Sequence, residues 1–197
     1  MRIFIVILSL IFLNKVSFTQ TFTECYDTLY WHLTHDSPPD PELMKNWKNC
    51  INGKSIPELS LTTVTGEKIK TKDLKGKVIV INLWFTTCHP CMTELPALNR
   101  LVEEYKNKDV VFLGISTDTK AMLDADFFPK YKFDFKIISD GKDVVKKIGH
   151  TGFPTFYIID KTGKVRDAWT GGAIDKTAET AAYLKAKPII DELLKGE

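Results

Sequence analysis

Residues 77–85, KVIVINLWF, constrain the fold of this 197-residue chain more than any other stretch. The segment is almost continuously apolar and rich in β-branched side chains, which is typical of a central strand buried on both faces. A strand of this kind needs neighbouring strands beside it and helices over it. The segment therefore predicts an α/β fold built around it.

The rest of the chain supplies the other elements of such a fold. Residues 58–70 alternate around a Thr-Gly pair and predict a hairpin. The expected order, counted from the central strand, is strand, helix, strand, helix and strand, followed after a short helix by a hairpin and a last helix, which gives a mixed sheet flanked by helices. The segments are helix 90–106, strand 110–116, helix 120–132, strand 135–139, helix 143–149, strands 155–160 and 164–169, and helix 177–194.

The N-terminus predicts export. Met1-Arg2 precedes an apolar run at residues 3–13 and small residues near Thr19, as in a secretory signal peptide. The run is shorter than the roughly 20 residues that span a bilayer, although an uncleaved membrane anchor is the alternative. We expect a signal peptide at 1–19, an extension at 20–55 and one domain at 56–197, in the periplasm or otherwise exported.

Composition narrows the class of partner. The chain is 44% apolar and 26% charged, a globular balance, and its formal charge of +2 includes Arg2 and Lys15. Residues 1–20 contain no acid, so the mature chain is close to neutral. Without a basic tract, neither nucleic acid nor an anionic membrane is expected as a partner.

Two of the four cysteines form the motif Cys88-His89-Pro90-Cys91, directly after the central strand. Covalent haem attachment needs a histidine after the second cysteine, where Met92 stands. A zinc site needs about four ligands, and the other cysteines and histidines are scattered singly, so we expect no metal. A structural disulfide would close too small a loop to add much stability, but it remains an alternative. A redox pair is the favoured interpretation.

Cys88 is the expected attacking cysteine. It stands where the strand gives way to a helix, and free backbone N–H groups and the helix dipole stabilise a thiolate there. Pro90 suits the first helical turn. Cys91 shares the face of Cys88 one turn deeper, which makes it the expected resolving cysteine.

Glu94 follows on the same helical face, three residues after the second cysteine. A partly buried carboxyl there would take and return the proton of the resolving thiol, whereas a solvated glutamate is the alternative. Two residues later, the ring of Pro96 clashes with the carbonyl of Met92, which predicts a kink.

A second proline outside the motif also attracts attention. Pro154 follows Phe153 immediately before a predicted strand. A cis bond there would turn the chain sharply, and a trans proline that opens a strand is the alternative.

The segments LKGKVIVINLWFTTCHPCMTELPALNRL, VVFLGISTD and GFPTFYIIDKTGKV resemble the TlpA/ResA-type branch of the thioredoxin-like superfamily, exported thiol-disulfide oxidoreductases related to AhpC/TSA proteins. The resemblance covers about residues 56–194 and implies a thioredoxin-like fold, here with an N-terminal β-hairpin and a short extension. In such proteins the first cysteine attacks, the second resolves, a glutamate moves protons and a cis-proline aligns the partner's backbone. These roles fall on Cys88, Cys91, Glu94 and Pro154.

Three residues in or near the motif either differ from the family pattern or are expected to change the reactivity of the cysteines. Thr87 stands where a tryptophan is common, so partner contacts of that ring are not expected here. His89 adds an imidazole that, when cationic, would favour the thiolate and make the pair more oxidising; an exposed histidine with little effect is the alternative. Asn82 replaces the buried aspartate of cytoplasmic thioredoxins, so Glu94 is expected to supply the proton function.

The extension at 20–55 lies outside this common core. Its turn-prone segment HDSPPDPE separates two predicted short helices. Cys25 and Cys50 lie in these helices. They either form a structural disulfide that staples the extension or act as further redox partners.

The leading hypothesis is an exported thiol-disulfide oxidoreductase that needs no cofactor. Its partners would be client proteins with disulfides or thiols and a redox partner protein. The alternatives are a peroxiredoxin-like thiol peroxidase, disfavoured because Phe85 stands where such enzymes carry threonine, and a non-catalytic binding or folding module with a permanently oxidised motif.

Overall fold

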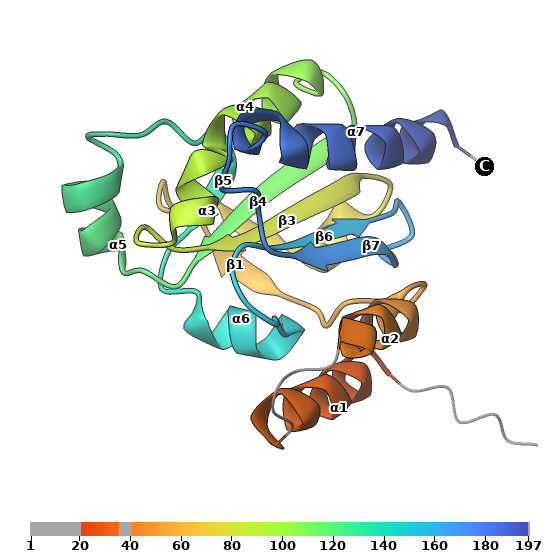
Figure 1. The fold of residues 1–197 in the computed structure, drawn as a ribbon. Helices are drawn as coiled ribbons and strands as arrows, with labels where there is room; N and C mark the ends of the chain where they lie inside the picture. The colour runs from red at the N-terminus through yellow and green to blue at the C-terminus, as the bar shows by residue number, and fades with distance from the viewer. Residues whose placement is uncertain (1–20, 36–40, 197) are drawn as a thin grey trace, which may run out of the picture.

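A five-stranded sheet forms the centre of the computed structural model, which describes residues 21–35 and 41–196 (Figure 1). The strand order is β5-β4-β3-β6-β7. Strand β3 is parallel to β4 and antiparallel to β6, β4 is parallel to β5, and β6 is antiparallel to β7. The mixed α/β sheet is confirmed. The strands are β3 (Val78–Trp84), β4 (Val110–Ser116), β5 (Lys136–Ile138), β6 (Thr155–Ile159) and β7 (Val165–Thr170).

Every residue of β3 is buried, as its apolar run predicts. Because side chains alternate across a strand, Val80 and Trp84 enter the core on one face, and Ile79 and Ile81 enter the core on the other. Asn82 lies in the same alternation as Val80 and Trp84. The one polar side chain of the strand therefore projects toward the helices on that face.

Three helices cover this face, above the sheet in Figure 1: α3 (His89–Thr93), α4 (Leu95–Glu104) and α7 (Ala178–Lys195). Leu98 and Leu101 of α4 and Ile190 of α7 are fully buried in the shared core. The layer thus holds the start of α3 against the end of the central strand.

The opposite face is covered by α6 (Lys142–Ile148) and by the N-terminal extension, α1 (Phe22–His35) and α2 (Pro41–Ile51). Between α2 and β3 the chain forms a hairpin of β1 (Ser60–Thr62) and β2 (Lys68–Lys70), followed by the short helix η1 (Thr71–Leu74). The rings of Phe22 and Trp47 each pack 6.0 Å from the ring of Tyr157 on β6. Lys48 adds an ion pair with Asp167 at 2.6 Å.

A disulfide between Cys25 and Cys50 joins α1 to α2, with their Cα atoms 5.8 Å apart. It closes a sequence separation of 25 residues. Crosslinks of this kind stabilise by reducing the freedom of the unfolded chain. The disulfide therefore ties the two helices of the extension into one unit.

Two predicted helices differ in the structure. The helix expected over residues 90–106 breaks at Glu94, which separates α3 from α4, rather than kinking at Pro96. Pro96 instead lies in the first turn of α4, where its missing N–H costs no hydrogen bond. The helix expected over 120–132 is only α5 (Lys120–Met122) followed by a π-helical turn, η2 (Leu123–Phe127).

The predicted signal peptide at residues 1–19 lies outside the described residues. Within the described part of the chain, no helix combines the length and the hydropathy needed to cross a bilayer.

Candidate redox site

The CxxC motif lies where the central strand meets α3. Beyond β3 the chain turns, and the backbone N–H of Cys88 donates to the carbonyl of Phe85 at 3.2 Å. Cys88 is the N-cap of α3, in an extended conformation, with Pro90 in the first helical turn. Its sulfur is disulfide-bonded to Cys91, and the backbone N–H of Cys91 donates to Cys88 Sγ at 3.3 Å.

This arrangement places the sulfur of Cys88 at the free N–H groups of a helix start. A thiolate formed there on reduction is stabilised by the N–H of Cys91 and by the helix dipole. Cys88 and Cys91 are 5% and 2% exposed. The pair is thus largely shielded from water in its disulfide form.

Glu94 occupies the break between α3 and α4. Its side chain is only 2% exposed, which excludes the solvated glutamate considered from the sequence. Burial raises the pKa of Glu94 to about 8, and the amide of Asn82 opposes this shift. Near neutral pH the carboxyl is mostly protonated but can still lose its proton, as an acid–base group requires.

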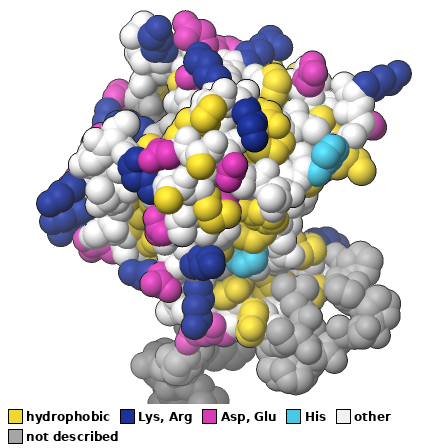
Figure 2. All heavy atoms as spheres, turned by 90° about the vertical axis from the view of Figure 1, so that its left-hand side faces the viewer, with side chains coloured by type: hydrophobic (Ala, Val, Ile, Leu, Met, Phe, Trp, Pro, Cys, Tyr) yellow, Lys and Arg dark blue, Asp and Glu magenta, His cyan; other side chains and the backbone are white. Residues whose placement is uncertain are grey.

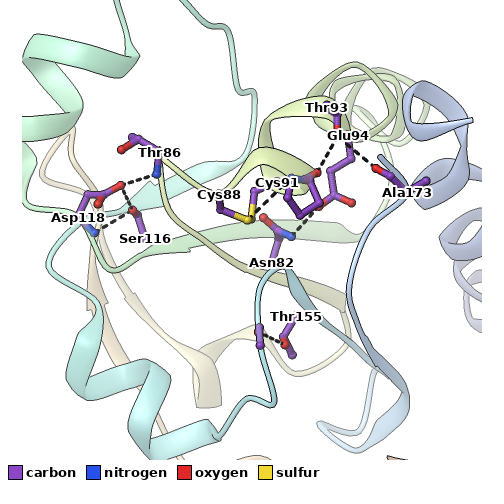
Figure 3. Close-up of a disulfide and its surroundings, with 12 residues drawn as sticks. Asn82, Thr86, Cys88, Cys91, Thr93, Glu94, Ser116, Asp118, Thr155 and Ala173 are labelled. Atoms are coloured by element: carbon purple, nitrogen blue, oxygen red, sulfur yellow. Dashed lines mark hydrogen bonds between the residues drawn. A yellow bond between two sulfur atoms is a disulfide. The ribbon is translucent and has the colours of Figure 1, made fainter. Parts of the chain in front are cut away.

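Asn82 reaches Glu94 from the central strand: its Nδ2 donates to Glu94 Oε1 at 3.5 Å, a long hydrogen bond. Figure 3 shows the two side chains pointing toward one another, beside the disulfide. A hydrogen-bond donor on a carboxylate favours its ionised form. The amide therefore supports the charge that burial disfavours.

The loop before β6 completes the site. The Phe153–Pro154 peptide bond is cis, and Pro154 packs close to Gly172, in the loop after β7. A Cβ atom on Gly172 would lie 3.4 Å from Pro154 Cγ, 3.4 Å from Pro90 Cβ and 3.0 Å from Glu94 Oε2. Gly172 is thus the point where the motif helix, the glutamate and the proline loop meet.

Thr93 connects the motif helix to the same loop. Its hydroxyl lies 3.1 Å from the carbonyl of Pro90 and 3.2 Å from the carbonyl of Ala173, and it can donate to either (Figure 3). The loop after β7 is thereby held against α3. The sequence reasoning did not single out Thr93, Ala173 or Gly172; the Gly-Gly pair after the last strand was the available signal.

A second missed contact lies on the other side of the motif. The carboxylate of Asp118 accepts hydrogen bonds from the backbone N–H of Thr86 at 2.7 Å and the hydroxyl of Ser116 at 3.2 Å. Asp118 is buried and follows the end of β4, the parallel neighbour of β3. Polar residues at the ends of two adjacent parallel strands were the signal for it.

Thr87 and His89 are exposed at the tip of the motif. Both are solvent-accessible, in contrast to the buried Cys91 and Glu94. Cys25 and Cys50 lie in the opposite layer, so the structure groups Cys88, Cys91, Glu94 and Pro154 and separates the other pair. Across residues 21–35 and 41–196, no three His, Cys, Asp or Glu side chains are grouped as metal ligands.

A strand-to-helix CxxC pair on a mixed sheet, opposite a cis-proline, defines a thioredoxin-like protein with a redox-type disulfide. The chain belongs to the AhpC/TSA family, whose model matches residues 52–168. The match includes both cysteines of the motif, Glu94 and Pro154, and stops before α7.

Individual relatives are similar to this chain over more than half of its length. The chain is 37% identical over 114 residues to the thiol-disulfide oxidoreductase ResA of Bacillus thuringiensis subsp. konkukian, a match covering 57% of this chain and 66% of ResA. It is 34% identical over 129 residues to the thioredoxin-like protein YneN of Bacillus subtilis, covering 64% of this chain and 76% of YneN. The first alignment thus spans slightly less than two thirds of that relative.

A solved structure supports the fold. The thiol:disulfide interchange protein of the thioredoxin family from Chlorobium tepidum superposes with a TM-score of 0.58 at 22% identity, covering 71% of this chain and 95% of that one. The thioredoxin-like fold is therefore confirmed. Both helices of the extension, α1 and α2, precede residue 52, where the family match begins.

Proposed function

We propose that the protein is an exported thiol-disulfide oxidoreductase that exchanges electrons with protein disulfides or thiols through Cys88 and Cys91. The observation that carries the proposal is a helix-capping Cys88–Cys91 disulfide followed one turn later by a buried glutamate. The relatives named thiol-disulfide oxidoreductase support the same chemistry.

In the reducing direction, the Cys88 thiolate attacks one sulfur of a client disulfide. A mixed disulfide forms, and the other client sulfur leaves as a thiolate that takes up a proton. Cys91 then loses its proton and attacks Cys88 Sγ, which releases the second client thiolate and closes the protein disulfide. Two electrons pass to the client, and the reverse sequence oxidises client thiols.

Glu94 is the proposed proton carrier of the second step. Its carboxylate accepts the proton of Cys91 as that thiol attacks, and its acid form returns a proton in the reverse direction. A carboxyl with an ordinary pKa would be a weak base near neutral pH. The raised pKa of Glu94 brings the carboxyl closer to the range in which a thiol titrates.

Client docking is proposed at the exposed edge of the site. Pro154 lies beside the motif helix, where a partner backbone would pass, and His89 and Thr87 are exposed next to it. His89 is proposed to adjust the thiolate, and Thr87 leaves room where related proteins carry a larger ring. The partners are client proteins and a second redox protein that resets the pair.

Export is supported by the sequence at residues 1–20 and by the two disulfides. Disulfides persist outside the cytosol and are rare within it. The Cys25–Cys50 disulfide is proposed to be structural. A periplasmic or otherwise exported location follows, with the signal peptide at residues 1–19 removed.

The decisive experiment is reduction of insulin disulfides driven by dithiothreitol. We expect Cys88→Ser to abolish catalysis and the double variant Cys25→Ser/Cys50→Ser to retain it, because the second pair lies in the opposite layer. Full activity of Cys88→Ser would refute the proposal. Rapid consumption of hydrogen peroxide by the reduced protein, without insulin reduction, would indicate a thiol peroxidase instead.

A further inference from the structure

A pocket of about 640 Å³ lies between the N-terminal extension and the thioredoxin-like domain. One wall is α1, with Tyr26 and Tyr30, and the other is α6 with Val145. The α1 wall precedes residue 52 and so lies outside the family match, whereas the α6 wall lies within it. Figure 2 shows the side of the molecule on which α6 lies, where hydrophobic side chains are exposed between lysine and acidic ones.

Helix α1 packs closely against the residue that follows α6. The ring of Tyr26 lies against Gly149, where an added Cβ would come within 2.2 Å of Tyr26 Cδ2. Gly149 also has a φ of +76°, which favours glycine. The absence of a side chain at Gly149 therefore sets the distance between α1 and α6.

The residues that line the pocket suit a ligand in which an apolar side chain lies next to a carboxylate. Aromatic rings come from Tyr26 and Tyr30, which are 6.0 Å apart, and from Phe153, whose ring lies 4.6 Å from that of His150. Burial lowers the pKa of His150, so its ring is neutral near pH 7. The charged lining residues are Lys142, Lys146 and Asp27, an excess of one positive charge.

One end of the pocket reaches the redox site. Phe153, in its lining, immediately precedes Pro154 and packs edge-on against Phe85 with ring centroids 5.0 Å apart. The carbonyl of Phe85 accepts the backbone N–H of Cys88. Phe153 and Phe85 thus connect the pocket to the start of the motif helix, so a polypeptide bound in the pocket would lie next to the redox site.

We propose that this pocket binds a segment of the client polypeptide that carries an aromatic or large aliphatic side chain beside a carboxylate. The apolar side chain lies between Tyr26, Tyr30 and Phe153, and the carboxylate faces Lys146 and Lys142. The inference rests on the proposed function, since it names the class of client that reaches Cys88. The volume exceeds that of one side chain and lies within the range of ligand pockets.

Binding is tested with a short fluorescent peptide that contains phenylalanine flanked by glutamates and no cysteine. We expect Lys146→Glu to weaken the affinity by about threefold to tenfold, the range of one partly exposed ion pair with its charge reversed. Lys147→Glu is the matched control on the same helix, because Lys147 points away and donates to the carbonyl of Glu58 at 2.7 Å. A peptide with lysines in place of the glutamates should bind more weakly.

A second pair of variants tests the aromatic residues of the pocket. Tyr30→Ala should weaken binding of the same peptide, whereas Tyr131→Ala, another exposed tyrosine stacked on Phe127 and outside the pocket lining, should not. Equal effects of Lys146→Glu and Lys147→Glu would overturn the proposal. Tighter binding of the lysine peptide would also overturn the proposal. Saturation of the pocket by a small aromatic acid that excludes the peptide would do so too. A dimer that Lys146→Glu dissociates would show that a second copy of the chain, rather than a client, occupies the pocket.

Because the peptide has no cysteine, the result is independent of thiol exchange. A wild-type protein that reduces insulin but does not bind the peptide would refute the pocket and leave the proposed function standing. Peptide binding without insulin reduction would refute the proposed function and leave the peptide-binding pocket standing.

Discussion

Asn82 and Glu94 meet in the core although one comes from the central strand and the other from a break between two helices. The amide Nδ2 of Asn82 lies 3.5 Å from Glu94 Oε1, and both residues are at most 2% exposed. A buried carboxyl with a single, long hydrogen bond is costly to ionise. The pair therefore holds a proton close to the disulfide near neutral pH.

Replacing Glu94 with glutamine should slow the resolving step of exchange. The change keeps the shape and removes the proton acceptor, so we expect a loss of about 100-fold near neutral pH, the low end of general acid–base effects. Single-turnover release of a client from its mixed disulfide measures this step. Glu103→Gln, an exposed glutamate of α4, is the control; similar rates in both variants would contradict the assigned role.

The same carboxyl should make stability depend on pH. Burial raises the pKa of Glu94 from 4.5 to about 8, so between these values the folded protein retains a proton that the unfolded chain has lost. The free energy of unfolding of the oxidised protein then falls as pH rises through this window. Relative to Glu94→Gln, wild type should lose about 2–4 kcal/mol between pH 5 and pH 8 in urea titrations. A constant difference would show that the carboxyl titrates near its ordinary value.

Gly172→Ala should impair exchange through Glu94. The added methyl group would lie 3.0 Å from Glu94 Oε2 and 3.4 Å from Pro154 and Pro90, so the carboxyl or the loop must shift. We expect a rate loss of several-fold, and the pH profile of the rate should move. In the background of Glu94→Gln, much of this loss should disappear, because contacting residues are not additive. Additive effects in the double-mutant cycle would mean that the methyl group acts elsewhere.

Removing the second disulfide should destabilise the extension. Cys25→Ser/Cys50→Ser opens a crosslink across 25 residues, for which the chain-entropy model gives about 3.5 kcal/mol. Urea unfolding should show a loss of about 2–4 kcal/mol. Hydrogen exchange should locate faster opening in α1 and α2, and unchanged protection there would show that packing alone holds the extension.

The sequence predicts the sheet well because each strand shows its burial in its own residues. The run from Val78 to Trp84 needs no tertiary information to be recognised as a central strand. The position of the CxxC motif at a helix start follows equally from what surrounds it. Cys88 and Cys91 could therefore be singled out from their neighbours in the chain alone.

Other features depend on contacts between distant segments. The burial of Glu94 comes from Asn82 and from the loop that contains Gly172, which lies 78 positions later in the chain. Local rules predict a kink at Pro96, but the helix instead breaks at Glu94. Asp118 could not be linked to Thr86 without the pairing of β3 with β4.

The packing of the extension on the sheet has a practical consequence for any shortened form of the protein. Phe22 and Trp47 shield Tyr157, and Ile51 is completely buried in the same core. A chain beginning at residue 56 would expose this apolar surface to water, and such patches favour aggregation. Studies of the redox chemistry should therefore retain α1 and α2, which cover this surface.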